Sequence, residues 1–267
     1  MREMTVRSLS GLLYVALIVF SALFSNLALI IVLTLFCALA LFEFQRLLKY
    51  KSPIPFLFLG LLIYQFFTKK IDSTLHIGLL FLCISANLLL AYLLLTKKSF
   101  VLAPYLKTSL ALFYLVTSAY FIVATSAFEN SIIHGITLYM YLLIWINNSF
   151  AYITGKKWGK TLLFVDVSPK KTWEGFWGGA SVCILVSIAI TPFQKDYALW
   201  VLPVLAVIVI VGATLGDLIQ SKFKRIAQVK DSGSLIPGHG GFYDRMDSVL
   251  FTAPFVNLFL IFVDYVS

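Results

Sequence analysis

Long runs of apolar residues, separated by short polar segments, cover most of the 267-residue chain. A helix that crosses a membrane needs about 20 such residues, because the hydrocarbon core is about 30 Å thick. The runs are continuous rather than alternating, which favours helices over the strands of a membrane barrel. They predict nine helices, over residues 12–24, 27–42, 54–67, 75–95, 106–128, 132–153, 176–191, 199–219 and 249–266.

The first two runs are separated only by Ser25 and Asn26. Residues 12–42 as one helix would be about 46 Å long at 1.5 Å per residue, too long for one crossing. A tight helical hairpin is therefore expected. Arg2 and Arg7 precede the first run as in a signal peptide, but a second apolar run follows at once, so we expect a retained first span.

The composition agrees with this pattern, because 60% of the residues are apolar and only 12% are charged. Soluble domains average roughly 45–50% apolar and 25% charged residues. We therefore expect an all-α polytopic membrane protein, which excludes a soluble enzyme domain, a disulfide scaffold and a disordered chain. Residues 1–140 would form N-terminal transmembrane helices, and residues 141–267 would form C-terminal helices with two cytoplasmic catalytic loops, 154–175 and 220–248.

The formal net charge of +9 is distributed unevenly along the chain. With nine spans and a cytoplasmic N-terminus, 18 of the 21 Lys and Arg residues fall on one side, and only Lys69, Lys70 and Lys195 do not. Cytoplasmic loops carry such an excess. We therefore expect a multi-pass protein of the cell (inner or plasma) membrane, with both polar loops in the cytoplasm and the C-terminus outside.

Acidic residues in and beside the last polar loop suggest chemistry. Asp217 ends an apolar run, where a carboxylate is costly, and Asp244 and Asp247 are three residues apart, on one face of a helix that begins there. Such acids can simply cap a helix. They can also hold Mg²⁺, which takes one or two carboxylates while substrate phosphates complete its shell. The glycines around His239 would let backbone N–H groups approach an anion. The alternative for His239 is a turn histidine that bonds to backbone.

Two stretches resemble the pattern of the phosphatidate cytidylyltransferases, also called CDP-diacylglycerol synthases. The first reads Ser221-x-Phe223-Lys224-Arg225, Lys230-Asp231-x-Gly233 and Ile236-Pro237-x-His239-Gly240-Gly241-Phe242-x-Asp244-Arg245-Met246-Asp247, after a lead-in Thr214-x-Gly216-Asp217. The second reads Ala151-Tyr152-x-x-Gly155-x-x-x-Gly159 and Ser168-Pro169-Lys170-Lys171-Thr172-x-Glu174-Gly175. The resemblance is specific over about the last 120 residues. The chain has Asn148 where the family usually has an aspartate.

The resemblance implies a nucleotidyltransferase of phospholipid biosynthesis that converts CTP and phosphatidate into CDP-diacylglycerol and pyrophosphate. The implied metal ligands are Asp217 and Asp244, which would bind Mg²⁺, and a second cation is left open. Asp247 would be a further catalytic residue, either as another metal ligand or as a contact of the ligand residues. The other implied catalytic residues are Lys224, Arg225 and Arg245, and the implied substrate-binding residues are Ser168, Lys170, Lys171, Thr172, Lys222, Lys230, His239, Gly240 and Gly241. Ser168 and Thr172 could instead cap the following helix.

Two other functions remain open at this point. One is a related membrane lipid nucleotidyl- or phosphotransferase with another lipid substrate. The other is an ion-coupled transporter in which Asp217 binds the coupling ion. The expected partners are CTP, phosphatidate and membrane lipid, with no nucleic acid, and a homodimer is left open.

Overall fold

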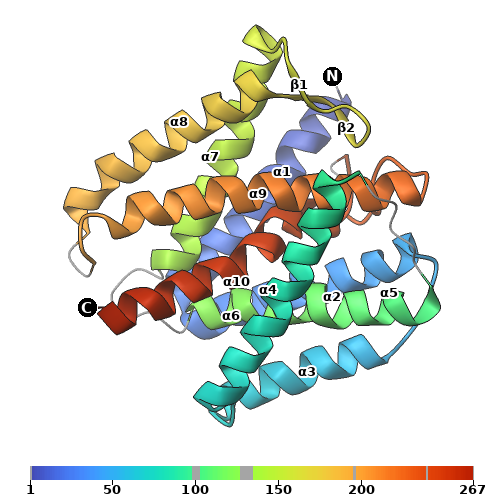
Figure 1. Cartoon of the computed structure of the whole chain (residues 1–267), viewed down its shortest axis with the longest axis vertical. Helices are drawn as coiled ribbons and strands as arrows, with labels where there is room; N and C mark the ends of the chain where they lie inside the picture. The colour runs from blue at the N-terminus through green and yellow to red at the C-terminus, as the bar shows by residue number, and fades with distance from the viewer. Residues whose placement is uncertain (1, 98–102, 127–134, 195–196, 239, 267) are drawn as a thin grey trace.

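The computed structural model describes residues 2–97, 103–126, 135–194, 197–238 and 240–266, which form a helical bundle (Figure 1). The N-terminal helices are α1 (Arg2–Phe24), α2 (Asn26–Leu47), α3 (Ile54–Phe67) and α4 (Ser73–Leu95). A continuous helical segment follows, made of α5 (Pro104–Leu110), the π-helical turn η1 (Ala111–Val116) and α6 (Thr117–Thr125). The C-terminal helices are α7 (Gly135–Trp158), α8 (Trp173–Ile190) with a 3₁₀ turn η3 (Thr191–Phe193), α9 (Val201–Ile226) and α10 (Tyr243–Val266).

Each predicted apolar run corresponds to a helical segment over its described residues, since residues 127–128 and 132–134 lie outside them, and the predicted hairpin is confirmed. The chain turns at Ser25, whose hydroxyl accepts from the N–H of Ala28 at 3.1 Å and caps α2. Within the described residues, seven helical segments are long and apolar enough to cross a membrane, while Leu9–Phe24 and Ile54–Phe67 are shorter. Fourteen residues of α3 give about 21 Å, less than the hydrocarbon thickness. The nine predicted helices are present, but α3 is too short for a full span, and the apolar part of α1, Leu9–Phe24, is shorter than the 23-residue helix.

The helices extend beyond the apolar runs, so both polar loops are shorter than predicted. α7 continues to Trp158, α9 to Ile226, and α10 begins at Tyr243 instead of residue 249. The added turns of α7 and α9 are rich in Lys and Arg, which are good helix formers although they end an apolar pattern. The first loop also contains an antiparallel hairpin that was not predicted, β1 (Leu162–Phe164) and β2 (Ser168–Thr172).

The polar segments predicted to lie on one side of the membrane gather at one end of the bundle. Three basic side chains link them by donating to backbone carbonyls: Lys107 to Leu48 (2.7 Å), Lys222 to Leu93 (2.9 Å) and Arg225 to Val167 (3.2 Å). The N-terminal helix joins this end, because the Ser10 hydroxyl donates to the Pro237 carbonyl at 2.9 Å. Figure 1 shows the C-terminus at the other end of the molecule.

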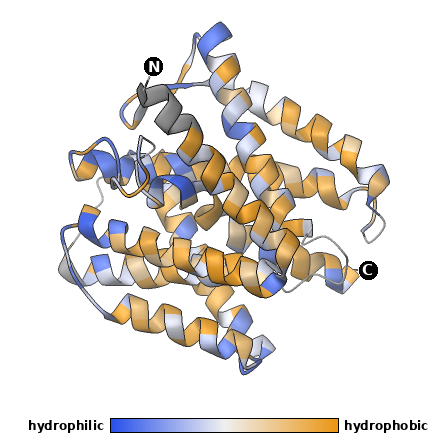
Figure 2. Cartoon of the chain, turned by 180° about the vertical axis from the view of Figure 1, so that it is seen from behind, coloured by the Kyte–Doolittle hydropathy of each residue, from blue (hydrophilic) through white to orange (hydrophobic). Residues whose placement is uncertain are grey.

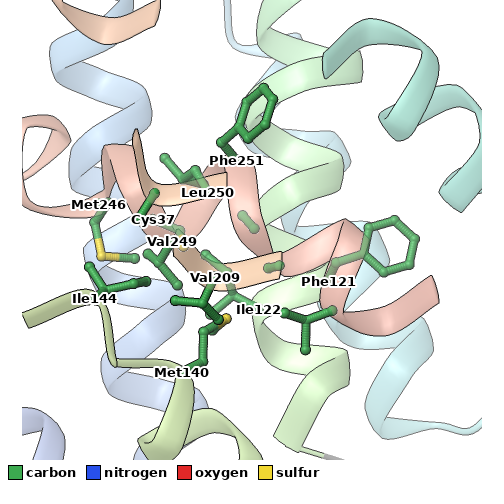
Figure 3. Packing of buried hydrophobic residues seen from close by; sticks show 14 of the residues in the cluster. Cys37, Phe121, Ile122, Met140, Ile144, Val209, Met246, Val249, Leu250 and Phe251 are labelled. Atoms are coloured by element: carbon green, nitrogen blue, oxygen red, sulfur yellow. The ribbon is translucent and has the colours of Figure 1, made fainter. Parts of the chain in front are cut away.

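The core is centred on α10, which packs against α9, α6, α2 and α4. In Figure 3, Met140 and Ile144 of α7 lie close to Val209 of α9 and Val249 of α10, and all four are at most 5% exposed. The outer helix faces are also apolar, whereas polar residues concentrate at helix ends and loops (Figure 2). Large side chains such as Phe20 and Phe81 are more than 70% exposed. A bundle that is apolar both inside and outside is a multi-pass membrane protein.

Glycines let two helix pairs approach closely at the polar end. A Cβ at Gly216 of α9 would lie 2.6 Å from the carbonyl oxygen of Asp247 in α10, and one at Gly212 would lie 2.7 Å from the Thr252 hydroxyl. The pair α7 and α8 has the same arrangement, since a Cβ at Gly179 would lie 2.6 Å from the Asn147 carbonyl. Small residues one turn apart are typical of close helix contacts in membranes. Each contact brings together the two helices that flank one of the motif regions.

Candidate active site

A cavity of about 780 Å³ opens at the polar end, between the β hairpin, α7, α8, α9, α10 and the segment before α10. This volume lies within the ~300–1,000 Å³ range of small-molecule sites. Its charged lining residues are Asp217, Asp231, Asp244, Asp247, Lys156, Lys170, Lys171, Lys224 and Arg245. The uncharged polar lining residues include Asn147, Asn148, Tyr152, Thr172, Thr214 and Gln220. Both motif regions thus contribute to one site.

Asp217 projects from α9 and meets Lys171 of the β hairpin. The Lys171 Nζ lies 2.6 Å from Asp217 Oδ2, and the Ser221 hydroxyl lies 3.3 Å from Oδ1. Both members of the ion pair are about 30% exposed on the cavity side. The pair joins the two motif regions and leaves part of each group accessible to a ligand.

Asp244, in the first turn of α10, is surrounded by donors. Its Oδ1 accepts from Lys224 Nζ (2.8 Å) and Gln220 Nε2 (2.6 Å). Its Oδ2 accepts from the N–H (2.9 Å) and hydroxyl (2.8 Å) of Ser232 and from the N–H of Gly241 (3.0 Å). The anion that the glycine-rich turn approaches is therefore this carboxylate.

Asp247, one turn further along α10, has a different environment. Its side chain lines the cavity although the residue is only 7% exposed. Its Oδ1 accepts from the N–H of Ser248, and among the described residues no basic side chain lies within 4.0 Å of it. Asp247 thus keeps coordination capacity that no basic side chain among the described residues fills.

The β hairpin is held over the cavity from both of its ends. The Glu174 carboxylate accepts from the N–H groups of Lys160 (3.0 Å) and Thr161 (3.1 Å) where the hairpin starts. The Thr172 hydroxyl accepts from the N–H of Gly175 at 3.1 Å and caps α8. The capping alternative is therefore confirmed for Thr172. These contacts fix the strand that carries Lys170 and Lys171.

Several predicted site residues do not line the cavity: Ser168, Lys222, Arg225, Lys230, Gly240 and Gly241. Ser168 pairs with Phe164 in the hairpin, Lys222 donates to the Leu93 carbonyl at the end of α4, and Arg225 donates to the Val167 carbonyl in the hairpin turn. Gly240 has a φ of +80°, which only glycine adopts easily, and contacts Asp244. His239 lies outside the described residues. Direct substrate contact by these residues stays a prediction.

Sequence reasoning missed Glu43 and gave no role to Gln220. Glu43 lies in α2, is 1% exposed, and accepts from the N–H of Tyr243 at 2.9 Å. The available signal was an isolated acid within an apolar run, which usually marks a functional position. Gln220 lies three residues after Asp217, so it falls on the same helix face.

Comparisons with known proteins show which family the chain belongs to. The model of the cytidylyltransferase family matches residues 5–263, which covers nearly the whole chain. The chain belongs to the cytidylyltransferase family. This membership confirms the predicted resemblance and a nucleotidyltransferase enzyme, and it decides against the transporter.

Curated members of the cytidylyltransferase family are similar over most of the chain. A protein of Staphylococcus haemolyticus named phosphatidate cytidylyltransferase is 33% identical over 265 residues, covering 97% of this chain and 99% of the relative. A protein of Bacillus subtilis with the same name is 33% identical over 277 residues, covering 97% of this chain and 98% of the relative. Staphylococcus aureus has a relative of that name that is 37% identical over 177 residues, covering 65% of this chain and 66% of the relative.

Proposed function

We propose that this enzyme transfers a cytidylyl group from CTP to phosphatidate, giving CDP-diacylglycerol and pyrophosphate. The observation that carries the proposal is the cavity at the polar end of a membrane bundle, where acids of α9 and α10 face Lys170, Lys171, Lys224 and Arg245. A cavity at the polar end of a membrane protein is accessible both to the phosphate of a membrane lipid and to a nucleoside triphosphate. The name shared by the relatives states the same activity.

The charges suit this reaction, because two polyanions must be brought together. An oxygen of the phosphatidate phosphate attacks the α-phosphorus of CTP, and the bond from that phosphorus to the bridging oxygen of pyrophosphate breaks. The electron pair leaves with pyrophosphate. Lys and Arg groups in a cavity stabilise the charge that develops there. The phosphate nucleophile is already ionised at neutral pH, so a strong protein base is not needed.

Divalent metal fits the acidic part of the cavity. Among the described residues, no group of three or more His, Cys, Asp or Glu side chains is placed to hold a metal ion. Two carboxylates together with substrate phosphates are enough for Mg²⁺. We assign this role to Asp217 and Asp247 instead of the predicted pair Asp217 and Asp244, because Asp244 already accepts five hydrogen bonds. When bound, Mg²⁺ would neutralise phosphate charge and orient both substrates.

The remaining residues would hold the substrates in place. Lys171 pairs with Asp217 and is partly exposed, so it can also contact a phosphate in the cavity. Lys224 pairs with Asp244 and lines the same cavity. We place this end of the bundle on the cytoplasmic side of the cell membrane, because cytoplasmic loops carry an excess of Lys and Arg. A homodimer and the lack of nucleic-acid binding stay predictions.

A direct assay tests the function. Purified protein in detergent is incubated with radiolabelled CTP, phosphatidate and Mg²⁺, and label is measured in the lipid phase. We expect labelled CDP-diacylglycerol, loss of labelling with EDTA, and recovery when Mg²⁺ is restored. Diacylglycerol in place of phosphatidate is the control. Phosphatidate formation from diacylglycerol, with no labelling from phosphatidate, would contradict the proposal and indicate a lipid kinase.

A further inference from the structure

Glu43 joins the N-terminal half of the chain to the segment that builds the site. It lies near the end of α2 and is 1% exposed. Its Oε2 accepts from the N–H of Tyr243 at 2.9 Å and lies 3.4 Å from the Ser232 hydroxyl. Tyr243 is the first residue of α10, where N–H groups have no partner within the helix. Glu43 therefore satisfies the start of α10 from about 200 residues away in the sequence.

Two motif glycines give this carboxylate its space. A Cβ at Gly233 or at Gly241 would overlap the Glu43 carboxylate. Among the described glycines only Gly238 and Gly240 have a positive φ, so backbone conformation does not demand glycine at these two positions. The space filled by Glu43 explains why a side chain is excluded there.

The same segment also holds Asp244. Ser232 and Gly241, which lie beside Glu43, donate to Asp244 Oδ2 at 2.8–3.0 Å. Asp244 in turn receives Lys224 from α9. Displacing the segment from Glu43 would move the donors of Asp244 and the first turn of α10, which leads directly to Asp247.

We propose that Glu43 is a positioning residue for this site: its carboxylate fixes residues 232–233 and 241–243 and, through them, the placement of Asp244 and Asp247. The site is then completed by α2, an element outside both motif regions. The effect on turnover rests on the proposed function, whereas the effect on the segment does not.

Hydrogen exchange in detergent, without substrates, tests the structural part. In Glu43→Ala we expect the amides of residues 230–245 to exchange at least tenfold faster than in the unmodified protein. Gln45→Ala is the matched control, since Gln45 is also buried in α2 but bonds to Ser52 in another loop. It should loosen residues 48–54 and leave residues 230–245 unchanged. Unchanged exchange in Glu43→Ala, or equal loosening by Gln45→Ala, would overturn the proposal.

A double substitution tests the steric part. Gly241→Ala alone should speed exchange over residues 230–245, because its methyl group meets the Glu43 carboxylate. The same change in a Glu43→Ala background should add no more than about twofold, because the space is then free. Fully additive effects would show that Glu43 and Gly241 act independently, against the proposal.

Turnover completes the test with Glu43→Gln, which keeps the side-chain shape and one acceptor for Tyr243. We expect Glu43→Gln to keep kcat within about twofold, and Glu43→Asp to lower kcat at least threefold at an unchanged melting temperature, because the shorter side chain cannot reach Tyr243. A fall in kcat that only follows the folded fraction would refute positioning. If the unmodified protein forms no CDP-diacylglycerol, the proposed function fails, and the exchange data still decide the role of Glu43.

Discussion

Asp244 and Asp247 lie one turn apart on α10, and the structure predicts opposite consequences for their replacement by asparagine. Asp244 uses both oxygens to accept five hydrogen bonds, including one from Lys224. An asparagine offers only one oxygen, so either the pair Lys224 and Gln220 or the pair Ser232 and Gly241 would face an NH₂ group. Asp244→Asn should therefore lower the free energy of unfolding.

The size of this effect follows from burial. The side chains of Asp244 and Lys224 are only 7% and 17% exposed. Removing one partner of a buried pair costs about 3–5 kcal/mol. With about 2–4 °C per kcal/mol for a chain of this size, the melting temperature should fall by roughly 6–20 °C.

Asp247→Asn should behave differently. Its oxygen can still accept from the N–H of Ser248, and the substitution removes a buried charge that has no basic partner among the described residues. The free energy of unfolding should change by less than about 1 kcal/mol. Losing a ligand for Mg²⁺ removes several kcal/mol of transition-state stabilisation, which is at least about a 100-fold loss of turnover.

The assay is CDP-diacylglycerol formation against Mg²⁺ concentration, together with a thermal melt in detergent for each variant. Asp264→Asn is the control, because Asp264 is an exposed acid near the far end of the same helix. It should change neither quantity. Near-normal turnover of Asp247→Asn, or an unchanged melting temperature of Asp244→Asn, would refute this division of roles.

Three further predictions concern other residues. Lys171→Met should lower turnover at least about tenfold, because the lysine would contact a substrate phosphate. The free energy of unfolding should change by less than about 1 kcal/mol, because the ion pair with Asp217 is partly exposed. Normal turnover in the assay above would argue against phosphate binding by Lys171. Asn148→Asp should keep or raise activity and lower the Mg²⁺ concentration needed, because Asn148 lines the cavity and a carboxylate attracts a hard cation. Loss of activity in a Mg²⁺ titration would instead show that the amide has its own role. Ser234→Cys should not react with an impermeant maleimide in intact cells if this end is cytoplasmic. The native cysteines add little background because all three are buried. Strong labelling would show that this end faces the outside of the cell.

The helical architecture could be predicted from the sequence because it depends on local properties. Continuous apolar runs must form helices in a membrane, since every backbone group has to be bonded within the segment. The break at Ser25 could be found because residues 12–42 would be too long as one crossing helix, and the structure adds that Ser25 caps the second helix. Helix ends were less accurate, since Lys222 to Arg225 interrupt the apolar pattern but continue α9. Residues of both motif regions line one cavity, but Ser168, Lys222 and Arg225 of the same motifs do not.

The roles within the site depend on contacts between distant segments. Asp244 and Asp247 have the same chemistry and share a helix face, so no local pattern distinguishes them. They differ because Ser232, Gly241 and Lys224 surround one carboxylate while the cavity borders the other. Glu43 could not be assigned for the same reason, as its partners lie about 200 residues away. Local patterning determines where a helix forms, whereas the hydrogen bonds of a buried acid are determined by whichever segments the tertiary fold packs against it.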